Sequence, residues 1–115
     1  MATNWNIIIN SGAEYQASVT IDTWPATFPA LSTATGWQLT LAQPGQSAFL
    51  TATTSNYITL NGAKTVGTIV IPSTVTSTLP CGSAFYDLDI LFTGNVVKRV
   101  ISLGLAQVNL KAGST

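Results

Sequence analysis

An all-β fold is predicted by three features of this sequence. Short runs rich in β-branched and aromatic residues recur roughly every ten residues, and apolar and polar residues alternate within them. Gly, Pro and Asn stand between the runs, where turns are expected. No stretch has a helical or heptad period, and no internal repeat occurs. At 115 residues the chain is expected to form one domain, over 1–115.

The predicted strands follow one another closely along the chain. The clearest is 15–22, in which Tyr15, Ala17, Val19 and Ile21 alternate with polar residues. The other predicted strands before residue 72 are 5–10, 37–42, 48–53, 56–60 and 67–71. One short helical turn is predicted near 73–79, because threonines there disfavour a longer helix. This spacing favours an antiparallel immunoglobulin-like β-sandwich of about seven to eight strands, with a small β-barrel as the alternative.

A long β-hairpin is predicted over 79–108. Gly94 and Asn95 separate two apolar runs, and both residues tolerate the positive φ that tight hairpin turns require. With these two residues as the loop, Leu91 lies opposite Lys98. Alternation then places on the core-facing side Leu88, Ile90, Phe92, Val97, Ile101 and Leu103. The opposite, polar side receives Asp87, Asp89, Lys98 and Ser102.

The charge balance indicates what kind of partner the protein has. Four basic and four acidic residues give zero net charge. Charged residues are 7% of the chain, against about 25% in an average protein. Nucleic acids and anionic membranes attract basic surfaces, so neither is an expected partner. Uncharged surfaces tend to associate, which predicts other proteins as partners and a homo-oligomer within a larger assembly. A neutral surface rich in Thr, Ser and Asn is the alternative interpretation.

Few residues could carry chemistry. The chain has no histidine and a single cysteine, Cys81, so neither a disulfide within the chain nor the common His and multi-cysteine sites are expected. Asp87 and Asp89 lie about 7 Å apart on one strand face, a separation near that of a retaining glycosidase. Pairing with Lys98 or Arg99 across the hairpin is the simpler interpretation. We therefore predict no enzyme activity, no cofactor and no metal.

Three aromatic residues are the predicted contact residues. Two prolines exclude the segment 24–29 from a central strand, so it is expected to fold over an edge of the core. Trp24 and Phe28 in this segment are the expected exposed pair, and together with Trp5 they are the predicted protein interface. A sugar-stacking face is the alternative, built from Trp5, Trp24, Trp37 and Tyr57.

The order of several short motifs resembles a family of small tailed-phage virion proteins. These motifs are Asn-Tyr-Ile-Thr-Leu-Asn-Gly at 56–62, Gly-Thr-Ile at 67–69, the Thr-rich segment 73–78, Leu-Pro-Cys-Gly at 79–82 and Tyr-Asp-Leu-Asp at 86–89. The N-terminal half is similar more loosely, through 12–15, Trp24 and 36–37. The likeness covers nearly the whole chain and is most specific over 56–89. Arg99 and Gly104 are spaced one residue wider than the family pattern.

The resemblance implies a fold and a role. The fold is immunoglobulin-like, similar to the N-terminal domain of upper baseplate proteins, and the motif residues pack or turn rather than react. The implied role is that of a non-enzymatic structural component on the tail side of a virion, as a baseplate, fibre-attachment or tail-tip adaptor. A capsid decoration protein and a carbohydrate-binding module are the alternatives. No signal peptide is read, so synthesis in the host bacterial cytoplasm is expected, and 111–115 are expected to form a mobile tail.

Overall fold

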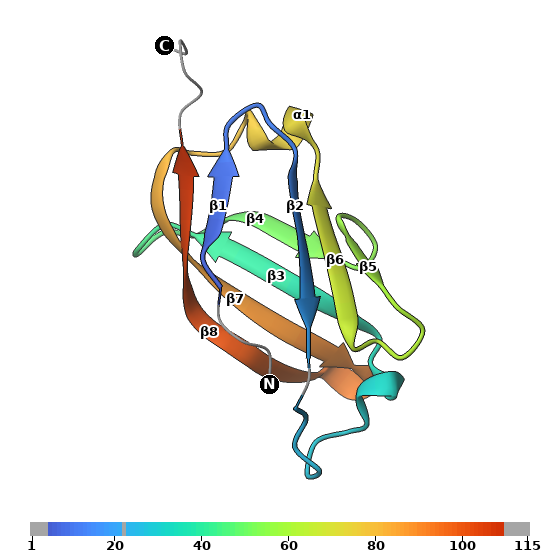
Figure 1. Ribbon diagram of the computed structural model, residues 1–115. Helices are drawn as coiled ribbons and strands as arrows, with labels where there is room; N and C mark the ends of the chain where they lie inside the picture. The colour runs from blue at the N-terminus through green and yellow to red at the C-terminus, as the bar shows by residue number, and fades with distance from the viewer. Residues whose placement is uncertain (1–4, 22, 110–115) are drawn as a thin grey trace.

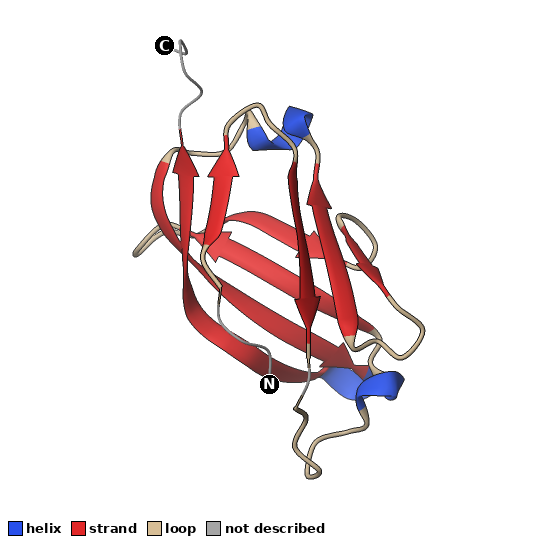
Figure 2. Ribbon diagram, in the orientation of Figure 1, coloured by secondary structure: helices blue, strands red, loops and turns tan. Residues whose placement is uncertain are grey.

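Two β-sheets face each other and enclose the core (Figures 1 and 2). The computed structural model describes residues 5–21 and 23–109, except the side chains of 102 and 103; the predicted tail 111–115 lies outside this range. The larger sheet contains, in spatial order, β1 (Ile7–Asn10), β8 (Val96–Asn109), β7 (Gly82–Phe92), β3 (Gly36–Ala42) and β4 (Ala48–Thr53). The smaller contains β2 (Tyr15–Thr20), β6 (Val66–Ile71) and β5 (Ile58–Leu60). The all-β prediction is confirmed.

Helical structure in the described residues is confined to single turns. The predicted turn near 73–79 is confirmed as α1 (Ser73–Thr76), which leads from β6 toward β7. Two short 3₁₀ turns lie at Leu31–Thr33 and Thr93–Asn95. Thr76 anchors α1 from inside, because its buried hydroxyl donates to the carbonyl of Ala13 at 2.9 Å. The connection from β6 to β7 is thereby fixed against the turn that joins β1 to β2.

The core fills the space between the sheets, and Trp37 lies at its centre. Its side chain is fully buried and its ring contacts Gly67 of β6, where a Cβ atom would lie 2.5 Å from Cζ3. Trp37 Nε1 has no hydrogen-bond partner among the described residues. A buried N–H without a partner destabilises the fold by about 1–3 kcal/mol. Burying about 200 Å² of ring stabilises it by about 5 kcal/mol. The balance therefore favours the buried ring.

One pair of strands corrects the prediction of a wholly antiparallel sandwich. β1 runs parallel to β8, with Ile7 paired to Ala106 and Asn10 to Asn109. The other strand pairs between named strands in the described structure are antiparallel. Antiparallel neighbours can be recognised by the turn that joins them, but strands from opposite ends of a chain share no turn. The sequence around β1 therefore gave no signal of its partner.

The register of the final hairpin also differs from the prediction by one residue. Leu91 pairs with Val97, not with Lys98. The reason is the loop, which contains three residues, Thr93–Asn95, instead of two. Two further irregularities of register lie between Tyr86 and Asp89. Such irregularities bend strands, and β7 and β8 curve visibly, so that the larger sheet curls around the core (Figure 1).

The change of register alters which side chains face the core. Four predicted core residues are confirmed as buried: Leu88, Ile90, Phe92 and Ile101. Val97 was predicted to face the core, but it is 49% exposed because the longer loop turns it to the outer face. Asp89 was placed on the polar side, yet it is only 6% exposed, since Gln38 and Arg99 flank it on the neighbouring strands. Ser102 and Leu103 lie outside the described side chains.

Asn95 gives a direct test of the hairpin geometry. Its φ is +60°, a left-handed conformation that asparagine tolerates and β-branched residues do not. Asn95→Val is expected to lower the free energy of unfolding by about 1–2 kcal/mol, as measured by urea denaturation. Asn95→Gly is the control and should leave stability equal or slightly higher. Equal stabilities of the valine and glycine variants would contradict the left-handed conformation of Asn95.

Candidate interaction surface

Histidine and clustered cysteine, which are common in catalytic and metal sites, do not occur in this chain. The sequence lacks histidine, and the single thiol, Cys81, is exposed and free. Over residues 5–21 and 23–109 no three His, Cys, Asp or Glu side chains gather as metal ligands would. In the same part of the chain no helix has the length and apolar character needed to cross a bilayer.

The two aspartates of β7 form an ion-pair cluster with Arg99. Arg99 Nε lies 2.8 Å from Asp89 Oδ1 and Nη2 lies 3.3 Å from Oδ2, while Nη1 is 3.6 Å from Asp87 Oδ2. The predicted pairing with Arg99 is confirmed. The hydrogen bond to Asp89, followed by the attraction of its charge, raises the pKa of Arg99. One guanidinium thus holds both carboxylates, an arrangement that stabilises a strand pair.

Lys98 is not part of that cluster, because it lies on the other face of β8. Its ammonium is 4.7 Å from the ring centroid of Phe28, a cation–π contact. Phe28 packs edge-on against Trp24 at 5.3 Å, and Trp24 in turn lies 6.2 Å from Phe92. The prediction that 24–29 folds over a core edge is confirmed. Trp24 and Phe28 are half-buried by contacts within the chain, so less of them is exposed than expected.

Trp5 ties the two sheets together. Its backbone N–H donates to the Tyr86 hydroxyl at 3.2 Å, and that hydroxyl donates to the Trp5 carbonyl at 2.6 Å. The indole Nε1 donates to the hydroxyl of Tyr15 at 3.1 Å, and the Trp5 and Tyr86 rings lie 4.9 Å apart. Tyr15 belongs to β2 and Tyr86 to β7. The structure thus assigns Trp5 an internal bridging contact; its predicted part in an interface stays a prediction.

The two tyrosines make stability sensitive to alkaline pH. Burial raises the pKa of Tyr86 and of Tyr15 above the ordinary 10.0. Because the folded state keeps the proton more tightly than the unfolded state, their contribution is complete below pH 10 and is lost as pH rises through the raised values. The free energy of unfolding by urea is therefore expected to fall above about pH 10. Tyr15→Phe should flatten that fall, and an unchanged slope would contradict the assignment.

The aromatic residues do not assemble into the sugar-stacking face that was the alternative prediction. Trp37 is fully buried and cannot contact a ligand. Trp5 and Trp24 each pack against other rings, at tilts of 50° and 74°. Tyr57 is half-buried. These four residues therefore provide no shared flat platform.

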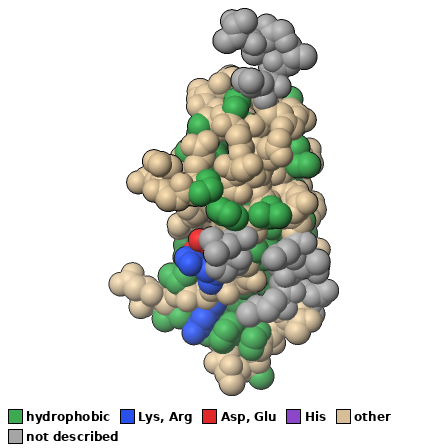
Figure 3. Space-filling model, turned by 90° about the vertical axis from the view of Figure 1, so that its left-hand side faces the viewer, with side chains coloured by type: hydrophobic (Ala, Val, Ile, Leu, Met, Phe, Trp, Pro, Cys, Tyr) green, Lys and Arg blue, Asp and Glu red, His purple; other side chains and the backbone are tan. Residues whose placement is uncertain are grey.

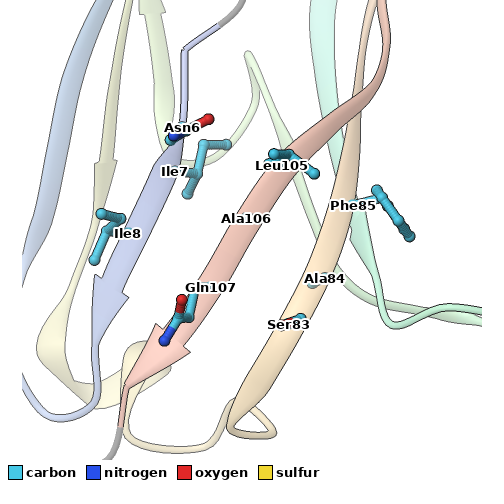
Figure 4. Close-up of a pocket in the computed structure, with 9 residues that line it drawn as sticks. All are labelled: Asn6, Ile7, Ile8, Ser83, Ala84, Phe85, Leu105, Ala106 and Gln107. Carbon is cyan, nitrogen blue, oxygen red and sulfur yellow. The ribbon is translucent and has the colours of Figure 1, made fainter.

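Among the described residues, the two most exposed of the large apolar side chains lie on the outer face of β1 and β8. Ile8 is 53% exposed and Leu105 is 58% exposed. Ile8 pairs with Gln107, which also pairs with Ser83, while Leu105 pairs with Phe85, so these side chains stand in two adjacent rows. With Asn6 they form what we call the outer patch: Asn6, Ile8, Ser83, Phe85, Leu105 and Gln107. They line a hollow of about 230 Å³ together with Ile7, Ala84 and Ala106. Figure 4 labels these residues on β1, β8 and β7 and in the segment before β1.

The outer patch was missed at the sequence level, although the sequence holds a signal for it. Ile7 and Ile9 are buried, so Ile8 between them must point outward. Alternation predicts a polar residue there, and isoleucine breaks that rule. Leu105 breaks it in the same way before the buried Ala106. Two such exceptions become informative only when the pairing of β1 with β8 is known, because it brings them together.

In comparisons with known proteins, neither a family model nor a curated protein sequence matches this chain.

Proposed function

We propose that this protein is a non-enzymatic structural component of a tailed-phage virion, on its tail side, as a baseplate, fibre-attachment or tail-tip adaptor that acts through protein–protein contacts. The outer patch supports the part of this proposal that concerns protein–protein contacts. It presents exposed Ile8 and Leu105 on adjoining strands, and none of its six side chains is charged. The cores of protein interfaces are likewise apolar and poor in charge.

The composition of the whole chain favours a protein that assembles with other proteins over one that is free in solution. Zero net charge and 7% charged residues leave little electrostatic repulsion between copies or neighbours. Contiguous apolar patches on a small protein mark contact sites more often than isolated exposed residues do. Among the side chains that Figure 3 colours by type, the visible charged ones lie in the lower half of the view. This low charge content is suited to contact with protein.

We also infer that the two sheets form an immunoglobulin-like sandwich, which supports the resemblance to phage proteins. The order β8-β7-β3-β4 matches strands G, F, C and C′ of that fold, and β2-β6-β5 matches B, E and D. The buried Trp37 lies on β3, where immunoglobulin domains carry a tryptophan on strand C. The disulfide between strands B and F has no counterpart, because the single cysteine is elsewhere and exposed.

The motifs from 56 to 89 carry the specific assignment to a phage virion, and their residues have structural tasks here. Tyr86 and Leu88 are buried, and Asp87 and Asp89 bind Arg99. Gly82 adopts a φ of +125° at the start of β7. A set of motif residues that pack, turn and pair agrees with a structural role and with no reaction.

The test is mass spectrometry of particles purified from a culture whose phage genome encodes this chain. The protein is expected in intact particles, on the order of tens of copies each for a tail position. Hundreds of copies would instead indicate a head decoration protein. Particles that are complete but lack the protein would overturn the virion role altogether.

A further inference from the structure

We propose that the Asn61–Gly62 peptide bond is a deamidation site, and that the turn between β5 and β6 slows the reaction as long as the turn stays closed. Seven asparagines occur in the chain, and Asn61 is the one that precedes a glycine. A glycine in that place leaves the following backbone nitrogen uncrowded, because it has no Cβ atom. The turn lies at one end of the smaller sheet (Figure 1). This inference does not depend on the proposed virion role.

The reaction uses only groups of this turn and water. The backbone nitrogen of Gly62 attacks Cγ of Asn61, and the new C–N bond closes a succinimide ring. The bond from Cγ to Nδ2 breaks, and ammonia leaves with the proton that the Gly62 nitrogen gives up. Water then opens the ring at either carbonyl, adding OH to the carbon and H to the ring nitrogen. The products are aspartate, or isoaspartate, in which the main chain runs through Cβ and Cγ and is longer.

The attacking nitrogen of Gly62 is free and open to solvent. Both Asn61 and Gly62 are exposed. Within residues 5–21 and 23–109 no acceptor binds the N–H of Gly62. A Cβ atom built on Gly62 would meet no atom within 4 Å. The nucleophile and the water that opens the ring therefore both have access.

The side-chain amide of Asn61, by contrast, is held by three hydrogen bonds. Its Oδ1 accepts from the N–H of Thr65 at 2.8 Å and from that of Val66 at 3.1 Å. Its Nδ2 donates to the hydroxyl of Thr65 at 3.1 Å. The backbone closes around it, since the Asn61 N–H donates to the Val66 carbonyl and the Lys64 N–H to the Asn61 carbonyl. An amide bonded at both of its polar atoms is not free to turn Cγ onto the nitrogen of Gly62.

Ring closure requires that these bonds are released. Nδ2 leaves as ammonia, so its bond to Thr65 is lost during the reaction. One hydrogen bond of average net strength corresponds to about fivefold in rate. The two bonds to Oδ1 add to this factor, because the whole amide has to turn. The folded turn is therefore expected to react more slowly than the same residues in an unfolded chain.

The two products differ in how well they fit the turn. Aspartate keeps an oxygen in the place of Oδ1, so the N–H groups of Thr65 and Val66 keep an acceptor, now a charged one. Isoaspartate lengthens the main chain between Leu60 and Gly67, which pair across the hairpin. Gly67 lies against the ring of the buried Trp37 and has little room to shift. The isoaspartate product is therefore expected to loosen β5, an edge strand of three residues.

Incubation of the purified full chain in mildly alkaline buffer tests the site, with one sample folded and one unfolded in urea. Peptide mass spectrometry follows the replacement of the amide by a carboxylate at each asparagine, and chromatography separates the aspartate and isoaspartate peptides. Asn61 is expected to be modified before the other asparagines. Its rate should be at least about tenfold higher in the unfolded chain. Gly62→Ala should suppress the reaction in both states, because the added Cβ crowds the attacking nitrogen.

Thr65→Val tests the hydrogen bonds themselves. Valine has a similar shape but no hydroxyl, so Nδ2 of Asn61 loses its acceptor while the two backbone donors stay. The folded chain should then react about fivefold faster, and the unfolded chain at its former rate. Thr59→Val is the matched control, because Thr59 lies in the same hairpin, is exposed and is not among the partners of Asn61. It should leave both rates unchanged.

Each of the remaining outcomes contradicts the proposal. An unfolded chain that is not modified at Asn61, or is modified first at another asparagine, overturns the site. A folded chain that reacts as fast as the unfolded chain overturns the restraint by the turn. Equal acceleration by Thr65→Val and Thr59→Val, or none by either, overturns the part of the hydrogen bonds. The virion role is decided separately, by the presence of the protein in particles, and is independent of these rates.

Discussion

Gly104→Ala is expected to lower the free energy of unfolding by about 3 kcal/mol, at the upper end of the range for overpacked cores. Gly104 lies opposite Tyr86 in the pairing of β7 with β8, and an added Cβ would overlap Cε1 and Cζ of the tyrosine ring. The ring cannot move aside easily. It is buried, and its hydroxyl is held by the backbone of Trp5. Urea denaturation of the variant and the natural chain measures the difference.

Gly62→Ala is the matched control, because a Cβ there meets no atom within 4 Å. Its effect should stay within about 0.5 kcal/mol. A double-mutant cycle with Tyr86→Leu isolates the overlap, since the smaller side chain makes room for the methyl group. In the Tyr86→Leu background, Gly104→Ala should lower the free energy of unfolding by clearly less than it does in the natural chain. If the single Gly104→Ala variant were as stable as the natural chain, β7 and β8 would not approach each other as closely as described.

Trp5→Ala is expected to lower the free energy of unfolding by about 2 kcal/mol. This is less than the 3–5 kcal/mol typical of fully buried aromatic residues, because Trp5 is half-buried. The variant loses the ring contact with Tyr86 at 4.9 Å and the indole hydrogen bond to Tyr15. Tyr15 belongs to the smaller sheet, so the loss also loosens the join between the sheets. Thermal or urea unfolding gives the size of the effect.

Trp5→Phe separates the two contributions. It keeps an aromatic ring beside Tyr86 but has no donor for Tyr15, so only about 1 kcal/mol should be lost. Amide hydrogen exchange along β1 should rise more in the alanine variant than in the phenylalanine variant. Equal losses in the two variants would mean that the ring contributes nothing and that Trp5 acts through its indole N–H alone.

The parts of the fold that the sequence predicts well are those whose signals are local. The alternation at 15–21 marks a strand whose Val19 is buried against the other sheet, as expected. The segment 24–29, with prolines at 25 and 29, forms no strand, and Trp24 packs against Phe92. Alternation and proline act on a residue through its own neighbours. No knowledge of distant segments is needed to read them.

The features that the sequence does not predict depend on distant pairing or on one residue of loop length. A loop of three residues instead of two moved Val97 from the core side to the outer side. The burial of Asp89 required Arg99 and Gln38 on two other strands. The outer patch required β1 beside β8, although Ile8 and Leu105 are almost a hundred residues apart. The burial or surface position of each of these residues can be predicted only when its neighbour across the sheet is known.

The parallel pairing of β1 with β8 also determines how this domain responds to tension. The two strands come from opposite ends of the chain, and they overlap at four residue pairs, from Ile7 with Ala106 to Asn10 with Asn109. A pull on the N-terminal side of Ile7 and the C-terminal side of Asn109 drives them past each other lengthwise. The hydrogen bonds between parallel strands are evenly spaced, so they share that shear load and yield together instead of opening one at a time. A domain built in this way can transmit force between its neighbours without first peeling open at an edge.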